Sequence, residues 1–165
     1  MANSTTNYAN RQVDIEFLQT IRTPNGVVPV QLSFTLGASR IVTGIQKLVQ
    51  RYTLLLLTRL GDVHFDTSQG STLITDLMYN GLTRNAGSLQ IAVAFANASV
   101  FSQMRLEDSR TDIYGDIPDD ERLQSAAMTD FSVDFSTGTL YLTIQLISVA
   151  GNSYVYVLPT TLTRE

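Results

Sequence analysis

Residues 127–158 read AMTDFSVDFSTGTLYLTIQLISVAGNSYVYVL, and this stretch decides the fold class. Three runs in it alternate apolar with polar residues, the pattern of half-buried strands: Ala127–Phe135, Leu140–Leu146 and Tyr154–Leu158. Turn residues separate them at Ser136-Thr137-Gly138 and Ala150-Gly151-Asn152-Ser153. The sequence therefore predicts a small, mainly antiparallel C-terminal sheet. Its last strand is expected to end at Pro159.

Helical periodicity precedes this sheet. Helices are expected at Ala38–Leu57, Thr72–Tyr79 and Gly87–Met104. Ser39 is a candidate N-cap of the first helix. Apolar residues at steps of three and four are expected to share its buried face: Ile41, Ile45, Leu48, Tyr52 and Leu55. Its other face would carry Lys47, Gln50 and Arg51. The last helix is expected to bury a second such set: Leu89, Val93, Ala96, Val100 and Met104.

Helices followed by strands indicate an α+β fold, with the helices packed on the sheet. Residues 1–12 are rich in Asn, Ser and Thr, and are expected to form a flexible arm before a single domain, 13–165. Val13–Leu36 is expected to form an extended segment or a loose hairpin around Pro24-Asn25-Gly26. The acidic stretch Arg105–Arg122 is expected to be a surface loop.

Composition narrows the function classes. The chain has 165 residues, a formal net charge of -4, no cysteine, and 16% charged residues. Its Lys and Arg residues are scattered, which argues against nucleic-acid binding. No apolar run reaches the length of a membrane span, and the polar N-terminus predicts no secretion signal. The low charged fraction favours a surface partly covered by protein partners.

Candidate catalytic residues are few. The lone histidine, His64, could be a general base, but it lies in an Asp/Gly-rich loop that is more typical of a surface residue. Asp108, Asp112 and Asp116 do not have EF-hand spacing, so a solvated loop is favoured over a metal site. A pair of acids in the same loop could serve glycoside hydrolysis only if an apolar niche raised the pKa of one of them. The sequence predicts no enzyme, no cofactor and no metal.

Two segments resemble a known family. The first segment combines a helix, a Leu-Leu-Leu-Thr element and a Gly turn: Ile45–Tyr52, Leu54–Thr58, Leu60-Gly61-Asp62-Val63, Phe65, Gly70 and Leu73. The second runs from Asp120-Glu121-Arg122-Leu123 through the three strands. Together they resemble the baseplate wedge, or sheath-initiator, proteins of contractile phage tails. That family is related to type VI secretion baseplate components and is often labelled lysozyme-like.

The resemblance implies roles for individual residues. Thr58 and Gly61 would end the first helix and turn Phe65 back into the core. The family's Glu-Pro-Arg motif falls at Asp120, Glu121 and Arg122, which would dock on the wedge, although the proline is missing here. Strand exchange with the tail sheath protein would involve five residues of the last two strands: Leu140, Leu142, Ile144, Tyr154 and Tyr156.

The family's function would make the chain a structural subunit that joins the wedge to the tube base and templates sheath assembly. Its expected partners are baseplate wedge proteins, the sheath protein and tail tube or hub proteins, in several copies within a six-fold assembly. The expected location is the virion tail baseplate, assembled in the host cytoplasm, with no nucleic acid or membrane bound. The alternatives are another tail component, such as a tube or connector protein, and a peptidoglycan-cleaving glycosidase.

Overall fold

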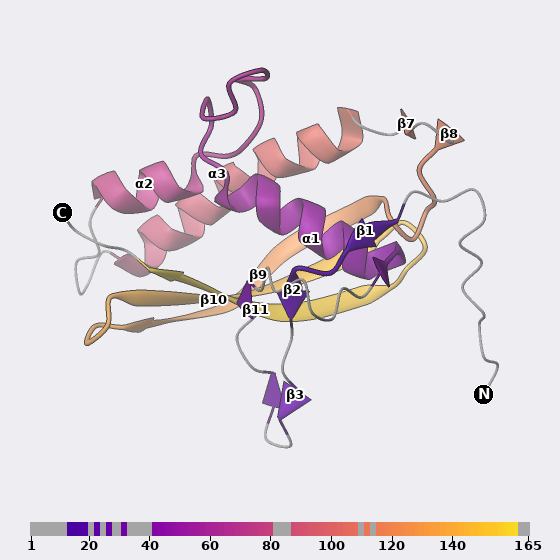
Figure 1. The fold of residues 1–165 in the computed structure, drawn as a ribbon. Coiled ribbons are helices and arrows are strands. Elements are labelled where there is room, and N and C mark those ends of the chain that lie inside the picture. Colours follow the sequence, from indigo (N-terminus) through magenta and orange to yellow (C-terminus); the bar gives the residue numbers. More distant parts are fainter. Residues whose placement is uncertain are drawn as a thin grey trace.

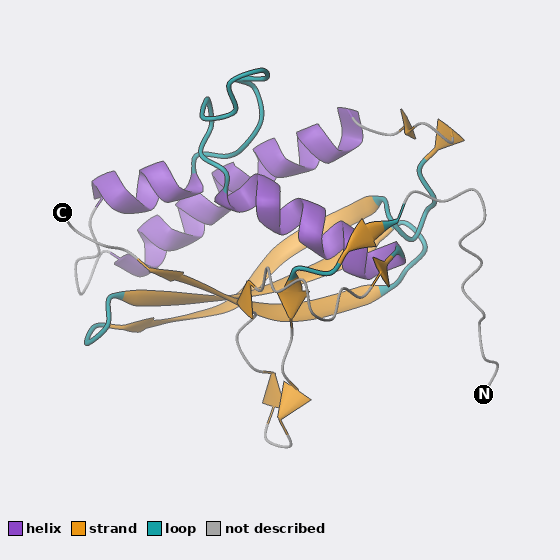
Figure 2. Ribbon diagram, viewed as in Figure 1, coloured by secondary structure: helices purple, strands orange, loops and turns teal. Residues whose placement is uncertain are grey.

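The computed structural model describes residues 13–19, 22–23, 26–27, 31–32, 41–80, 87–108, 111–112 and 115–161. Three helices lie over one face of a three-stranded antiparallel sheet (Figures 1 and 2), so the predicted α+β fold is confirmed. The predicted arm, residues 1–12, lies outside the described residues.

The sheet consists of β9 (Leu123–Asp134), β10 (Thr139–Ser148) and β11 (Ser153–Thr161), in the order β11-β10-β9. All three strands are longer than the alternation predicted. The prediction that Pro159 ends the last strand is wrong, because Pro159 lies within β11 opposite Tyr141. A proline is tolerated there because β11 is an edge strand, where an N–H directed away from the sheet has no ladder partner to lose.

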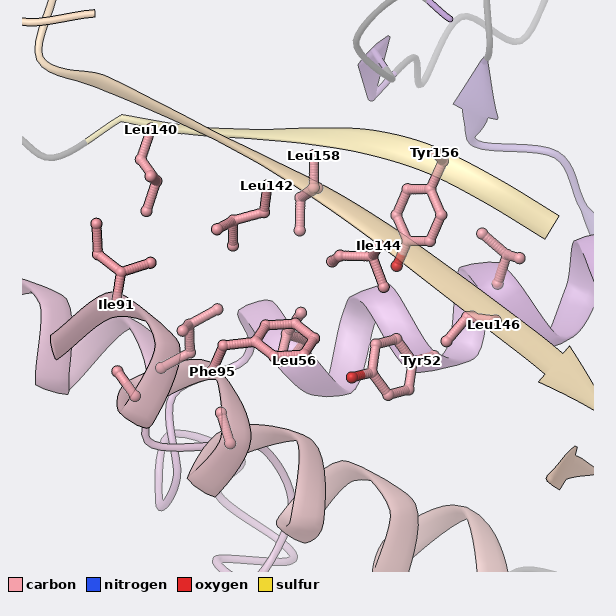
Figure 3. Packing of buried hydrophobic residues seen from close by; sticks show 14 of the residues in the cluster. Tyr52, Leu56, Ile91, Phe95, Leu140, Leu142, Ile144, Leu146, Tyr156 and Leu158 are labelled. Atoms are coloured by element: carbon pink, nitrogen blue, oxygen red, sulfur yellow. The ribbon is translucent and has the colours of Figure 1, made fainter. Parts of the chain in front are cut away.

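Alternation along β10 places its even-numbered residues against the helices. Leu140, Leu142, Ile144 and Leu146 are fully buried, as is Tyr156 of β11. Figure 3 shows these side chains directed toward residues of the helical layer. Each fully buried leucine or isoleucine stabilises the fold by about 1.5–3 kcal/mol relative to an exposed one. The contact between the sheet and the helices therefore forms the hydrophobic core.

The helices are α1 (Gly44–Leu57), α2 (Leu73–Asn80) and α3 (Gly87–Asp108). The predicted start of the first helix at Ala38 is wrong at the described positions, because Ile41–Val42 forms a strand, β6, paired with β1 (Asp14–Ile15). Two successive β-branched residues favour that extended backbone. Thr43, with extended backbone, takes the N-cap position, and the proposed cap Ser39 lies outside the described residues.

The face of α1 that meets the core includes Leu48, Tyr52 and Leu56. Lys47 and Gln50, which we expected at the solvent face, are instead buried. Both polar side chains find partners inside: Glu121 for Lys47 and backbone of the N-terminal segment for Gln50. Burial of such groups is tolerated only when their hydrogen bonds are satisfied.

The expected core face of α3 is its solvent face. Five apolar residues on it are exposed, which we call the α3 stripe: Leu89, Val93, Ala96, Val100 and Met104. The helix buries the opposite side, with Ile91, Phe95 and Ala98 in the core. α3 is therefore apolar on two faces, a composition more typical of a helix covered on both sides than of one at a free surface.

Short strand pairs complete the described chain. β2 (Leu18–Gln19) pairs with β5 (Gln31–Leu32), and β3 (Arg22–Thr23) pairs with β4 (Gly26–Val27), as a loose hairpin requires. Pro24 and Asn25, which were expected to turn it, lie outside the described residues.

The predicted loop Arg105–Arg122 is shorter than expected. Its first residues extend α3 to Asp108, and the rest contains a two-residue pair, β7 (Thr111–Asp112) with β8 (Gly115–Asp116).

Candidate functional site

The predicted docking triplet lies beside the first turn of α1, but its three side chains have different surroundings. Glu121 is buried: one carboxylate oxygen accepts a hydrogen bond from Lys47 Nζ at 2.8 Å, and the other accepts from the Gly44 N–H at 3.1 Å. Asp120 is half-buried and lies against Gly44. Glu121 thus fixes the start of α1 to the chain that precedes β9, and its carboxylate is not available at the surface.

Arg122 lies in a hollow of the surface. Its Nη1 donates to Asp119 Oδ1 at 3.1 Å, while its Nε is buried and has no hydrogen-bond partner within the described chain. The hollow, of about 310 Å³, is also lined by Met104, Glu107 and Gln124. The Arg122 side chain as a whole is 34% exposed, so a partner that brings an oxygen acceptor together with apolar surface could contact its guanidinium beside the exposed Met104.

The residues predicted for strand exchange belong mainly to the core. Leu140, Leu142, Ile144 and Tyr156 are fully buried, and Tyr154 is half-buried. β10 pairs with a neighbouring strand on each side, so the expectation that it offers an edge is wrong. Within the part of the chain that the structure describes, the two outer edges of this sheet belong to β9 and β11.

The β9 edge carries features that hinder pairing. Thr129 forms a β-bulge, because its neighbours Met128 and Asp130 pair with consecutive residues of β10 and it pairs with none. Its hydroxyl donates to the Thr143 carbonyl at 3.3 Å. The Asp130 carboxylate accepts the N–H of Phe131 at 2.8 Å. Bulges and charged side chains are both common means of protecting an edge strand.

The β11 edge has neither a bulge nor a charged side chain, and Pro159 is the feature along it that hinders pairing. Residues 153–161 include no charged side chain, and Val155 is 41% exposed on the face away from the helices. No other strand among the described residues pairs with this edge. Uncharged, valine- and tyrosine-rich segments of this kind readily accept another strand.

The backbone direction of β11 follows from the register. The Phe131 N–H is bound by Asp130, so it points away from β10, and Phe131, Leu142 and Leu158 lie in one row. Residues of an antiparallel strand alternate in direction, which makes Leu158 face β10 and Pro159 face outward. The same alternation directs the N–H groups of Val155 and Val157 to the open side, where Pro159 interrupts the row of donors.

The predicted position of Phe65 is also wrong. It was expected to return to the core, but it is 94% exposed at the tip of the loop between α1 and α2. The Asp66 N–H donates to the Val63 carbonyl at 3.1 Å, which closes a turn with His64 and Phe65 at its centre. Figure 2 shows this loop projecting from the helical layer, away from the sheet. The sequence analysis missed this surface because it placed Phe65 in the core from the family resemblance, and no local pattern tested that placement.

The His, Asp and Glu side chains that could act in catalysis or bind a metal do not cluster in the described part of the chain. His64 is exposed, and no group of three or more His, Asp or Glu residues in the described ranges could hold a metal ion. Hydrogen bonds lower the pKa of Asp66 and of Asp134, chiefly from Ser68 and Ser136 respectively. A glycosidase acid needs the opposite shift. None of the described helices is long and apolar enough to span a membrane.

No family model matches the chain, and no curated protein or solved structure matches it. The resemblance to baseplate wedge proteins therefore stays a prediction.

Proposed function

We propose that this protein is a structural subunit of a contractile-tail baseplate that docks on wedge and tube-base proteins and starts sheath assembly. In this proposal, several copies in a six-fold baseplate each present the outer edge of β11 to a strand of the first sheath ring. The observation that carries the proposal is the difference between the two edges of the sheet. β9 is bulged and carries Asp130, whereas β11 is uncharged and open.

Strand addition at β11 has a defined extent. A partner strand would accept hydrogen bonds from the outward N–H groups of Val155 and Val157, and pairing would stop at Pro159, which has no N–H. Val155 would meet a side chain of the added strand on the face away from the helices, where an apolar or aromatic partner stabilises the pair by about 0.2–1 kcal/mol.

A second surface, the hollow lined by the end of α3 and the start of β9, would dock on the wedge. The hollow around Arg122 opens beside Met104, the last residue of the α3 stripe. A row of exposed apolar residues such as the α3 stripe is typical of a protein–protein interface. Arg122, and not the buried Glu121, is the member of the triplet that a partner carboxylate or carbonyl could reach.

The proposal is tested by co-expressing the chain with the sheath and wedge proteins of the same genome. Wild type would be compared with Val155→Lys and Val157→Pro. Ser132→Lys is the matched control, because Ser132 lies on the β9 edge and on the same face of the sheet as Val155. The expected result is that wild type and Ser132→Lys nucleate sheath in negative-stain images, whereas the two β11 variants do not. Lysine hinders edge pairing, and proline removes one outward donor.

A second arm separates docking from strand exchange. Val155→Lys is expected to co-purify with the wedge complex although it nucleates no sheath, and Arg122→Glu is expected to lose the wedge complex. Equal nucleation by Val155→Lys and wild type would overturn the assignment to β11. A chain that binds neither component and cleaves peptidoglycan would overturn the structural role itself.

A further inference from the structure

The loop from Thr58 to Ser71 carries Phe65 on a rigid frame. At its neck, the Ser71 N–H donates to the Thr58 carbonyl at 2.8 Å, and the Leu60 N–H donates to the Ser71 carbonyl at 3.0 Å. The buried Ser71 hydroxyl donates to the Leu56 carbonyl at 2.7 Å. The ends of the loop are thus bonded to each other, and one bond ties them to α1, as in the compact Ω-loops that often carry function.

The tip of the loop is equally constrained. The Asp66 carboxylate accepts hydrogen bonds from the side chains of Ser68 and Gln69, and also from the Ser68 N–H. These bonds lower the pKa of Asp66 and keep it ionised. An exposed aromatic side chain on a frame of this kind loses little conformational freedom when it binds a partner, which favours affinity.

A shallow groove of about 530 Å³ lies beside Phe65. Its apolar wall consists of Leu54, Leu55, Val63 and Phe65, and Leu54 is 47% exposed. α1 supplies the leucines, and the loop supplies the valine and the phenylalanine. The groove therefore joins two elements and exposes large apolar side chains that a free surface rarely clusters.

The charges that line the groove have a definite sign. The charged side chains that line the groove are Arg51 of α1, Arg105 of α3 and Asp66 of the loop. Their formal charges sum to +1, on a chain whose net charge is -4. Arginine forks favour planar carboxylates, and arginine is enriched in the energetic centres of interfaces.

We infer that this groove, here called the Phe65 groove, binds an acidic amphipathic segment of a partner protein. The segment inserts an apolar side chain against Phe65 and Leu54 and places a carboxylate near Arg51 or Arg105. This inference goes beyond the proposed function and does not depend on it, because the groove lies on the helical layer and includes neither the β11 edge nor Arg122.

The test is a selection of displayed random peptides of about 16 residues, long enough for one helix, on the immobilised full chain, with Phe65→Ala as the counter-selection bait. The expected peptides carry a large apolar residue flanked by Asp or Glu. A synthetic copy of the most enriched peptide would then be titrated by fluorescence anisotropy. Phe65→Ala is expected to weaken it at least about tenfold, which is about 1.4 kcal/mol.

Phe135→Ala is the matched control, because Phe135 is also an exposed phenylalanine but lies in the turn between β9 and β10. It should leave the affinity unchanged. Arg105→Gln should weaken binding and reduce its salt dependence. Phe65 is almost fully exposed, so its variant should fold; thermal unfolding checks this.

Three outcomes would overturn the inference. Enriched peptides that are basic, or that bind Phe65→Ala as well as wild type, would remove the acidic segment as the occupant. Self-association that light scattering shows to depend on Phe65 would make a second copy the occupant. Phe65-dependent sedimentation with phosphatidylserine vesicles, without peptide binding, would make the groove a membrane contact.

Discussion

The ammonium group of Lys47 and the carboxylate of Glu121 lie 2.8 Å apart, and their side chains are 6% and 1% exposed. The pair joins α1 to the chain just before β9, between residues 74 positions apart in the sequence. The second oxygen of Glu121 accepts the Gly44 N–H at the first turn of the helix. The contact therefore positions the helical layer relative to the sheet.

Removing one partner of this pair is expected to be costly. Lys47→Met leaves the Glu121 carboxylate buried without its ammonium partner, and should lower the free energy of unfolding by about 3–5 kcal/mol. Lys47→Met/Glu121→Gln makes both positions neutral and keeps an acceptor for the Gly44 N–H, so it should lie within about 1–2 kcal/mol of wild type. Urea unfolding measures both values.

Arg59→Met is the matched control for this prediction. Arg59 and Asp62 form an ion pair at 4.0 Å, with both side chains more than half exposed. Such pairs contribute at most about 1 kcal/mol. A Lys47→Met cost no larger than that of Arg59→Met would show that the buried pair is dispensable.

The sequence predicted the fold class because its strongest signals are local. Alternation in residues 140–146 required only the period of a strand, and the structure buries that face. Lys47 and Gln50 were misplaced because their partners, Glu121 and the backbone near Phe17, are distant in sequence. The α3 stripe was misplaced because that helix is apolar on both faces, and periodicity cannot choose between two such faces.

Buried tyrosines make the stability fall at alkaline pH. Burial raises the pKa of Tyr52 to about 12, although the hydrogen bond with Ser99 partly opposes this, and burial raises the pKa of Tyr156 as well. An unfolded tyrosine loses its proton near pH 10. Above that pH the unfolded state binds fewer protons than the folded state, so stability decreases as pH rises. The contribution is complete below about pH 10 and, for Tyr52, is lost by about pH 12.

Urea midpoints at about pH 8 and about pH 11 check this prediction. Tyr52→Phe should lose less stability between these two pH values than wild type, because one of the shifted groups is gone. Tyr141→Phe is the control, since Tyr141 is only half-buried on the sheet face away from the helices. The explanation is wrong if wild type and Tyr52→Phe lose stability equally.

Gln50 holds the N-terminal segment onto α1. Its side-chain oxygen accepts the N–H of Phe17 at 2.8 Å and of Leu18 at 3.3 Å, and its Nε2 donates to the Ile15 carbonyl at 3.1 Å. Gln50→Leu should lower the unfolding free energy by about 1–3 kcal/mol, because buried backbone groups lose their partners. Hydrogen exchange should accelerate at the Phe17 and Leu18 amides and remain slow in β10.

Gln46→Leu provides the comparison, one turn earlier on α1 at an exposed position. It should leave exchange near Phe17 unchanged. Equal acceleration in both variants would show that the segment is held by its apolar contacts alone.

The candidate surfaces were less predictable than the fold. The register that turns Pro159 outward depends on how β9, β10 and β11 pair, and a local pattern does not contain that pairing. The exposure of Phe65 depends on a loop closed by Ser71 against α1, a contact between residues 15 positions apart. Arg122 was identified only through the family resemblance, and its hollow requires the end of α3 to be in place.

Two glycines of the loop provide the last prediction. Gly70 has φ +102°, and a Cβ added there would lie 2.5 Å from the Thr58 carbonyl oxygen and 2.9 Å from that of Arg59. Gly61 has φ +91° but no heavy atom within 4 Å of the same position. Gly61→Ala should therefore cost only the strain of a left-handed residue, about 1–2 kcal/mol. Gly70→Ala should cost more, roughly 3 kcal/mol or above, because the neck of the loop must open.

Urea unfolding and hydrogen exchange together separate these two effects. The Leu60 and Ser71 amides bond across the neck, so they should exchange faster in Gly70→Ala and not in Gly61→Ala. The same opening should loosen the frame that presents Phe65 and reduce peptide binding at the Phe65 groove. Similar costs for the two substitutions would show that the close approach at Gly70 relaxes without opening the neck. The rigid presentation of Phe65 would then lose its structural basis.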